Sequence, residues 1–180
     1  MCYNYRTGGV TMDFKLKCWT EFKKVFYYSM GLRKLAEQMI IPWKRYEQLT
    51  SIAIDEMVQM IDENYIKLLI IDMDGTLKHY KDGLLECNKE WIEIMKEYVK
   101  IHIITNSSET YTKEVADKLD IPYLSSAKKP LPIGFKKILE QEHVDRENVI
   151  LIGDATVTDI FGAHRAGIEK TILLDDISVK

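Results

Sequence analysis

Short apolar runs alternate with amphipathic stretches from about residue 66 onward. Four of the runs consist almost entirely of Leu, Ile and Val, which is typical of strands buried on both faces of a sheet. These runs are Lys67–Asp72, Lys100–Thr105, Val149–Gly153 and Thr171–Leu174, and Ile121–Leu124 is a weaker fifth candidate. The pattern therefore predicts five strands.

Apolar residues with helical spacing lie between the predicted strands, and Gly167 is placed to end the last helix. The helical positions are Ile92, Met95 and Val99; Thr112, Val115, Ala116 and Leu119; Phe135, Ile138 and Leu139; and Val157, Ile160, Phe161 and His164. A further helix is predicted at about Asp55–Glu63. Strands that alternate with helices of this length favour right-handed βαβ units, an open parallel sheet and the α/β class.

The charge is uneven along the chain. With 180 residues, 46% of them apolar, the chain is long enough for one domain with a substantial core. The net charge of -3 does not indicate a nucleic-acid partner. Residues 1–46 carry nine Lys or Arg and three Asp or Glu, which leaves -9 for residues 47–180. We therefore predict a basic, aromatic-rich helical extension at 1–46 and the main domain at 47–180.

The cysteines and the apolar runs indicate the compartment. Cys2, Cys18 and Cys87 are scattered and odd in number, as expected for reduced thiols rather than a disulfide framework or a zinc site. No run approaches the 18 or so apolar residues of a membrane span, and the N-terminus lacks the features of a secretion signal. These features predict a cytoplasmic protein.

The strongest chemical signal is the run Asp72-Met73-Asp74-Gly75-Thr76-Leu77, directly after a predicted strand. Where a strand turns into a loop, two acids two residues apart can border one pocket. Phosphoryl transfer through a covalent intermediate uses such a pair: one carboxylate attacks phosphorus, while the other protonates the leaving oxygen and then activates water. Asp72 and Asp74 are the candidates for these roles, and Gly75 and Thr76 are candidates for contact with the phosphate.

Polar residues also follow two other predicted strands. Thr105-Asn106 offers a hydroxyl and backbone N–H groups to phosphate oxygens, although such residues are more often helix caps. The run 153–159 (GDATVTD) supplies Asp154 and Asp159. Magnesium prefers roughly six oxygen ligands, commonly one or two carboxylates with water and phosphate. We predict a Mg²⁺ site formed by Asp72, Asp154 and the Asp74 carbonyl. Asp159 is predicted to lie nearby, either as a further ligand or in contact with one of the ligands.

A lysine completes the candidate set. A site with three carboxylates and a phosphate is strongly negative even with one Mg²⁺, and a lysine ammonium group offsets that charge. Lys129 is the first choice and Lys128 the alternative. Because a Lys-Lys pair is usually a solvated turn, this assignment depends on the other motifs.

In this order, the motifs resemble those of the haloacid dehalogenase (HAD) superfamily over roughly residues 66–175: DMDGTL, then Thr105, then Lys129-Pro130, then GDATVTD. The resemblance implies a Rossmann-like fold with strand order 5-4-1-2-3. It also implies Asp72 as nucleophile, Asp74 as acid and base, Thr105 and Lys129 as phosphate-binding residues, and Asp154 with Asp159 at the metal.

Two longer runs, 127–139 (AKKPLPIGFKKIL) and 153–168 (GDATVTDIFGAHRAGI), are similar to the YqeG-like branch of subclass IIIA, as is the stretch Leu49–Met57. That branch includes phosphatidylglycerophosphate phosphatases. The resemblance therefore implies a Mg²⁺-dependent phosphatase that acts either on this phospholipid or on another large or soluble phosphomonoester.

The spacing of the motifs predicts an open site. Only 30 residues separate Asp74 from Thr105, which leaves room for a short flap at 78–83 but none for a cap. A solvated turn is the simpler interpretation of this flap, and capture of an anion by its basic tip is the alternative. Residues 14–45 mix basic and aromatic side chains, a pattern of helices that lie on anionic membranes, although packing on the domain or on a partner is also consistent with it. The predicted location is thus cytoplasmic, with peripheral contact to the inner membrane face as an option.

Two other functional classes use part of this pattern. A receiver domain of a signalling protein also places an Asp, a Thr or Ser and a Lys on a parallel sheet. Receivers, however, have their acidic pair and their phospho-acceptor on different strands, whereas Asp72 and Asp74 share one strand end. A non-catalytic scaffold is the third hypothesis, and the presence of every core residue argues against it.

Overall fold

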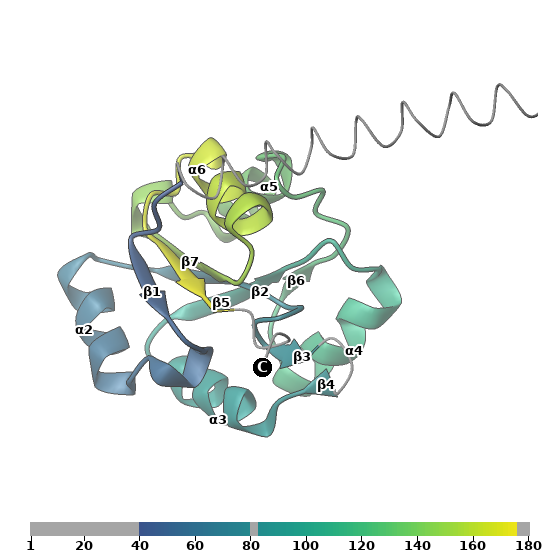
Figure 1. Ribbon diagram of the computed structural model, residues 1–180, viewed down its shortest axis with the longest axis horizontal. Coiled ribbons are helices and arrows are strands. Elements are labelled where there is room, and N and C mark those ends of the chain that lie inside the picture. Colours follow the sequence, from purple (N-terminus) through teal and green to yellow (C-terminus); the bar gives the residue numbers. More distant parts are fainter. Residues whose placement is uncertain (1–39, 80–82, 176–180) are drawn as a thin grey trace, which may run out of the picture. The chain divides into compact units, whose positions relative to one another are not determined.

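A six-stranded parallel sheet forms the centre of the fold (Figure 1). The computed structural model describes residues 40–79 and 83–175. The strands are β1 (Lys44–Tyr46), β2 (Leu68–Asp72), β5 (Lys100–Ile104), β6 (Tyr123–Leu124), β7 (Val149–Gly153) and β8 (Thr171–Leu174). Their spatial order is β1-β8-β7-β2-β5-β6, so the order implied for the five predicted strands is confirmed.

The prediction of five strands was wrong by one, because β1 adds a sixth at the edge of the sheet. Lys44 pairs with Ile172 and Tyr46 pairs with Leu174, both in parallel register. The side chains of Lys44 and Tyr46 also bind the Glu56 carboxylate, which fixes β1 to the helix beside it. The last three residues of the segment predicted as an extension therefore belong to the sheet. Residues 1–39 of that segment lie outside the described residues.

Helices cover both faces of the sheet and give a three-layer α/β/α arrangement. One face carries α2 (Ile54–Glu63), α3 (Glu86–Met95) and α4 (Glu109–Leu119), and the other carries α5 (Ile133–Glu142) and α6 (Gly162–Ala166). Along β2, Leu69 and Ile71 pack on the first face, whereas Leu68 and Ile70 pack on the second. Burial on both faces explains why the strand is a continuous apolar run.

The remaining elements are short. A hairpin of β3 (Lys78–His79) and β4 (Gly83–Leu84) follows β2, and 3₁₀ turns occupy Leu49–Ser51 and Arg146–Asn148. The helix predicted around Val157–His164 is divided into a π-helix, Thr156–Phe161, and α6. Gly167 ends α6 with a φ of +86°, as predicted. Val99 is buried but follows α3, which ends at Met95.

A buried histidine on β5 couples the stability of the fold to pH. His102 is buried and its Nδ1 lies 3.1 Å from Oε1 of Glu142, so the neutral ring donates this N–H to the carboxylate. Burial lowers the pKa of His102 below the ordinary histidine value of about 6.5, and the hydrogen bond and charge of Glu142 only partly oppose that effect. The folded protein therefore binds fewer protons here than the unfolded chain at mildly acidic pH.

We predict that the free energy of unfolding falls as the pH is lowered through 6.5 toward the lower folded-state pKa, and that this contribution is fully present above 6.5. Urea denaturation of the wild type and of a His102→Gln variant at a series of pH values would measure it. The variant should show a smaller loss between neutral and mildly acidic pH. Equal slopes for the two proteins would show that His102 does not carry the effect.

Candidate active site

The carboxyl ends of three neighbouring strands bring the predicted residues together. β2 lies between β5 and β7, and Asp72, the last residue of β2, is in register with Ile104 of β5. Thr105 directly follows β5, and Asp154 directly follows β7. A pocket of about 220 Å³ lies at this edge of the sheet. Its lining residues are Asp72, Asp74, Thr105, Asn106, Ser107, Lys129, Asp154, Ala155 and Thr158.

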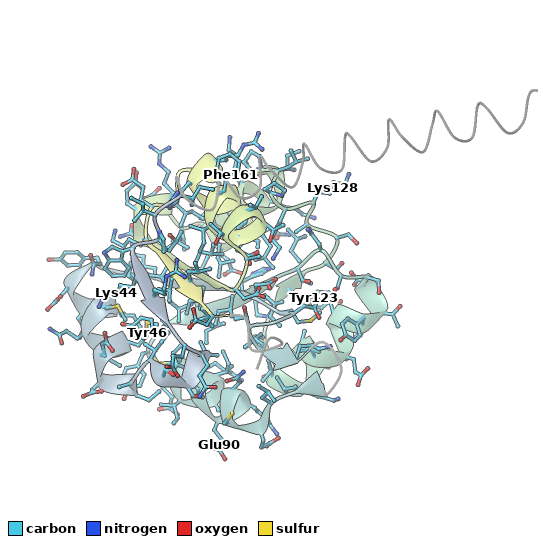
Figure 2. The ribbon with its side chains drawn as sticks, viewed as in Figure 1. Lys44, Tyr46, Glu90, Tyr123, Lys128 and Phe161 are labelled. Carbon is cyan, nitrogen blue, oxygen red and sulfur yellow. The ribbon has the colours of Figure 1, made fainter. Side chains whose placement is uncertain are left out.

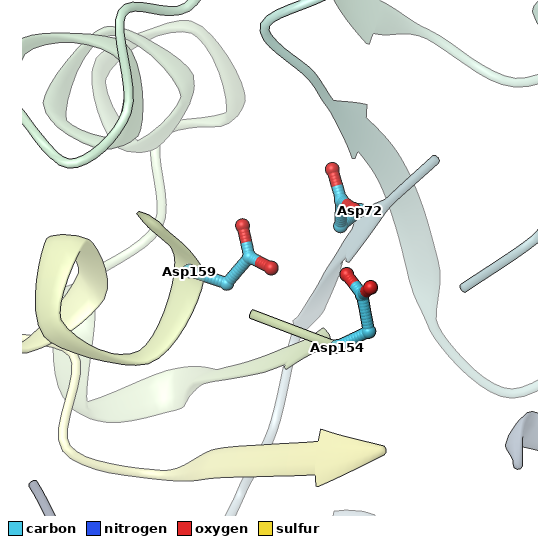
Figure 3. Close-up of side chains that lie close together, drawn as sticks. All are labelled: Asp72, Asp154 and Asp159. Atoms are coloured by element: carbon cyan, nitrogen blue, oxygen red, sulfur yellow. The ribbon is translucent and has the colours of Figure 1, made fainter. Parts of the chain in front are cut away.

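Three carboxylates form an acidic cluster beside the pocket. Asp72, Asp154 and Asp159 each place one carboxylate oxygen within 4.8 Å of the oxygens of the other two. Figure 3 shows the three side chains converging from β2, from the loop after β7 and from the π-helix. Hard oxygen donors of this kind suit Mg²⁺, so the residues present fit the predicted metal.

The three acids do not have equal surroundings. Asp159 is fully buried, and its Oδ1 accepts a hydrogen bond of 2.6 Å from Lys129 Nζ. Its Oδ2 accepts a hydrogen bond of 3.0 Å from the backbone N–H of Ala155. Because both of its oxygens already have a protein donor, Asp159 is placed to hold Lys129 and the loop after β7. Asp72 and Asp154 line the pocket, whereas Asp159 does not, so Asp72 and Asp154 are the two carboxylates that border the space a metal could occupy.

The position of Asp159 depends on the local backbone. A π-helix is wider than an α-helix and occurs often at functional sites, and here it carries Asp159 beneath the pocket. Gly153 leaves the space for this, because a Cβ atom there would lie 2.6 Å from Asp159 Oδ2. Gly75 likewise leaves space for the Asp154 carboxylate, since a Cβ atom at position 75 would lie 2.7 Å from Asp154 Cγ. Gly75 also has a φ of +84°, a conformation that favours glycine.

Lys129 is the central cation of the site. Its Nζ lies 2.5 Å from Asp72 Oδ1, and the side chain is buried. Asn106 fixes the backbone of Lys129, because the Asn106 amide accepts from Lys129 N at 2.7 Å and donates to Lys129 O at 3.0 Å. Lys128 is exposed. The geometry thus places Lys129, and not Lys128, at the pocket, and it uses the Asn106 side chain to position Lys129.

Burial and charge act in opposite directions on the two ionic partners. Burial raises the pKa of Asp72 well above its ordinary range, and the charge of Lys129 opposes that rise. Burial alone would lower the pKa of Lys129, but the charges of Asp72 and Asp159 outweigh it and raise that pKa. The positive charge of Lys129 thus favours the deprotonated form of Asp72, which burial alone would disfavour.

Asp74 is held from two sides. The hydroxyl group of Ser107 donates to Asp74 Oδ2 at 2.5 Å, and Lys78 Nζ lies 3.7 Å from Asp74 Oδ1. The Lys78 side chain is only 2% exposed, and its ammonium group lies 4.0 Å from the centre of the Tyr111 ring. For Lys78, the interpretation of the flap as a solvated turn is therefore wrong. Residues 80–82 at the tip of the flap lie outside the described residues.

Thr76 has a different place from the one predicted. Its side chain is buried, is not part of the pocket lining, and its Oγ1 has no hydrogen-bond partner among the described residues. Its carbonyl oxygen accepts from Asn88 Nδ2 at 3.0 Å, and Leu77 O accepts from the same group at 3.1 Å. Asn88 therefore fixes the loop that carries Asp74 and Gly75.

Sequence reasoning did not single out Ser107, Asn88 or the contact of Lys78 with Asp74. Ser107 stands directly after Thr105-Asn106, so its place in the same loop was a usable signal. Asn88 lies in a helix 14 positions from Asp74, and the sequence carries no local sign that its amide reaches back to this loop.

Comparisons with known proteins identify relatives of this chain. A family model described as haloacid dehalogenase-like hydrolase matches residues 87–167, which include Thr105, Lys129, Asp154 and Asp159. The chain is also similar to a protein of Bacillus subtilis (strain 168) named "Probable phosphatase YqeG". The two are 31% identical over 118 residues, which cover 64% of this chain and 69% of that protein.

Two solved structures are also similar. An uncharacterized protein from Listeria monocytogenes serotype 4b is 25% identical, with a TM-score of 0.49 over 57% of this chain and 75% of that chain. The cobalt-bound deoxy-D-mannose-octulosonate 8-phosphate phosphatase from Haemophilus influenzae is 17% identical, with a TM-score of 0.49 over 63% of this chain and 80% of that chain.

Proposed function

Since the chain belongs to the haloacid dehalogenase-like hydrolases, within the branch of YqeG, we propose that it is a Mg²⁺-dependent phosphomonoester phosphatase. The observation that carries this proposal is the pocket in which Asp72, Asp74 and Lys129 meet at the carboxyl edge of the sheet. Release of inorganic phosphate from an aryl phosphate in the presence of Mg²⁺ is the experiment that tests it.

The proposed reaction has two steps. A carboxylate oxygen of Asp72 attacks phosphorus, the bond from phosphorus to the leaving oxygen breaks, and Asp74 gives its proton to that oxygen. Water then attacks the aspartyl-phosphate and Asp74 takes a proton from it. The bond between phosphorus and Asp72 breaks, which releases inorganic phosphate and restores both carboxyl groups.

The other residues of the pocket stabilise charge and hold positions. Lys129 and Thr105 are proposed to bind the phosphate oxygens, together with backbone N–H groups of the loop that begins at Asn106. Ser107 and Lys78 hold Asp74, and Asp159 holds Lys129. A bound Mg²⁺, held by Asp72, Asp154 and the Asp74 carbonyl, would offset the negative charge of the phosphoryl group and orient it for attack.

Removing the metal is expected to abolish activity. EDTA should reduce phosphate release to background and added Mg²⁺ should restore it. Asp154→Asn should raise the Mg²⁺ concentration needed for half-maximal activity by about tenfold or more. Asp159→Asn should lower kcat with little change in that concentration, because we assign Asp159 to Lys129 and not to the metal. An unchanged rate in EDTA, or equal Mg²⁺ requirements for the two variants, would contradict this assignment.

Phosphatidylglycerophosphate is the substrate that we propose to test first, followed by other large or soluble phosphomonoesters. An accessible pocket supports this choice, because the described chain between β2 and α3 contains only the β3–β4 hairpin. A panel of these substrates at equal concentration would rank them by kcat/KM. A lipid substrate that is no better than a sugar phosphate would remove the lipid assignment.

We also propose a cytoplasmic protein that contacts the membrane through its basic N-terminal part. No helix among the described residues is long and apolar enough to cross a membrane. The predicted contact at 14–45 lies outside the described residues except for residues 40–45. Flotation of a Lys23→Gln/Lys24→Gln variant with anionic vesicles would test the contact through the N-terminal part. Binding equal to that of the wild type would contradict it.

A further inference from the structure

Three large apolar side chains are exposed next to the catalytic pocket. Leu131 is 41% exposed, Ile133 is 63% exposed and Phe161 is 38% exposed. Leu131 lies two residues after Lys129, and Phe161 lies three residues after Thr158, so each follows a residue that lines the pocket. Single exposed apolar residues are common on protein surfaces, but a cluster of them beside a functional site indicates an interaction surface.

Contacts bring the segment that follows Lys129 and the segment around Phe161 side by side. The Arg165 guanidinium lies 5.7 Å from the centre of the Phe161 ring, and its Nη1 donates to Pro130 O at 3.3 Å. A Cβ atom on Gly162 would lie 3.2 Å from Pro130 Cα, so the start of α6 packs directly on the turn that precedes α5. We call Leu131, Ile133 and Phe161 the apolar rim.

Basic side chains lie close to members of the apolar rim. The chain from Ile121 to Leu139 contains no Asp or Glu, although residues 47–180 carry a net charge of -9. The exposed cations are Lys128, Lys136, Lys137 and Arg165. Lys136 and Lys137 follow Ile133 at helical spacings of three and four residues, so they share its face of α5. Figure 2 shows Lys128 and Phe161 in the part of the domain formed by α5 and α6.

We propose that the apolar rim and its four cations form a docking surface for an anionic lipid bilayer. Apolar side chains enter the headgroup region while lysine and arginine contact anionic headgroups, and this surface offers both beside the pocket. Docking here would bring the open pocket close to phosphomonoesters held in the membrane. The inference extends the proposed phosphatase function to the place where its substrate is presented.

Charge argues against two other occupants of this surface. Residues 1–39 carry seven Lys or Arg and three Asp or Glu, so this segment would meet cations with a net positive charge. A second copy of the chain in a symmetric pair would place the same four cations opposite one another. An anionic bilayer is complementary to all of them.

Vesicle flotation of the full chain tests the proposal. Vesicles of phosphatidylcholine alone are compared with vesicles that also contain phosphatidylglycerol. The rim variants are Leu131→Ser/Ile133→Ser and Lys136→Gln/Lys137→Gln. Matched controls are Ile94→Ser, an exposed isoleucine on α3, and Lys113→Gln/Lys118→Gln, exposed lysines on α4. Hydrolysis of a soluble aryl phosphate is measured for every protein.

We expect the wild type to bind the anionic vesicles preferentially and each rim variant to bind them at least about tenfold more weakly. The controls should bind like the wild type, and all proteins should keep wild-type kcat/KM on the soluble substrate. The proposal would be overturned if the rim variants floated like the wild type. It would also be overturned if the wild type bound vesicles with and without phosphatidylglycerol equally. A rim variant that instead dissociates an oligomer would assign the surface to protein contact.

The two readouts separate this inference from the proposed function. A chain that floats through the apolar rim but releases no phosphate would retain the docking surface and lose the phosphatase assignment. A chain that hydrolyses the aryl phosphate but binds no vesicle would retain the phosphatase assignment and lose the docking surface.

Discussion

Asp72→Asn is expected to lower phosphate release by at least about a thousandfold, because the amide cannot form the aspartyl-phosphate and no other group in the pocket replaces the nucleophile. Steady-state hydrolysis of an aryl phosphate at saturating Mg²⁺ measures the effect. The loss should appear in kcat, since Lys129 and Thr105, the side chains proposed to bind the phosphate, remain in place.

Two controls make this result specific. Asp72→Ala excludes activity recovered by slow deamidation of the asparagine, and thermal unfolding of both variants shows whether the fold is intact. Activity within tenfold of the wild type in a folded Asp72→Ala protein would remove Asp72 from the mechanism.

Lys129→Met is expected to lower the free energy of unfolding by about 3–5 kcal/mol as well as to abolish activity. Lys129 lies 2.5 Å from Asp72 and 2.6 Å from Asp159, and all three side chains are buried. Removing the cation leaves two buried carboxylates without their partner, and loss of one member of a buried ionic group typically costs that amount. Urea denaturation measures the change.

Magnesium and a neighbouring lysine provide the controls for Lys129→Met. The destabilisation should shrink when Mg²⁺ is added, because the ion would supply positive charge to Asp72. Lys128→Met, at the adjacent exposed position, should change stability by no more than about 0.5 kcal/mol. Equal effects of the two substitutions would show that the buried ionic contacts do not stabilise the fold.

The sequence predicted most of the sheet because its central strands carry a strong signal. β2, β5, β7 and β8 are buried on both faces, which forces nearly continuous apolar runs. β1 was not predicted because Lys44–Tyr46 is a three-residue edge strand with two charged side chains, and so lacks the apolar run of the other strands. Its identity comes from pairing with β8, which is 128 residues away in sequence at the Lys44–Ile172 pair and leaves no local pattern.

The site residues that stand at the ends of predicted strands could be identified from the sequence. Asp72, Asp74, Thr105 and Asp154 follow predicted strands, and the sheet order brings them to one pocket. The choice between Lys128 and Lys129 needed the structure, because it depends on the backbone contacts with Asn106. The burial of Lys78 was hidden for a similar reason, since its contacts with Asp74 and Tyr111 form only after folding.

If Asp72 is the nucleophile, it becomes phosphorylated during turnover, and a rapid acid quench followed by peptide mass spectrometry would detect the phosphorylated residue. Asp74→Asn should slow hydrolysis of the intermediate, so this variant is mixed with an aryl phosphate and Mg²⁺ and quenched after a single turnover. We predict one phosphoryl group on the peptide that contains Asp72, and none when Asp72→Asn is added to the variant. Stoichiometric release of the aryl alcohol with no phosphorylated Asp72 at any quench time would show that Asp72 is not the nucleophile.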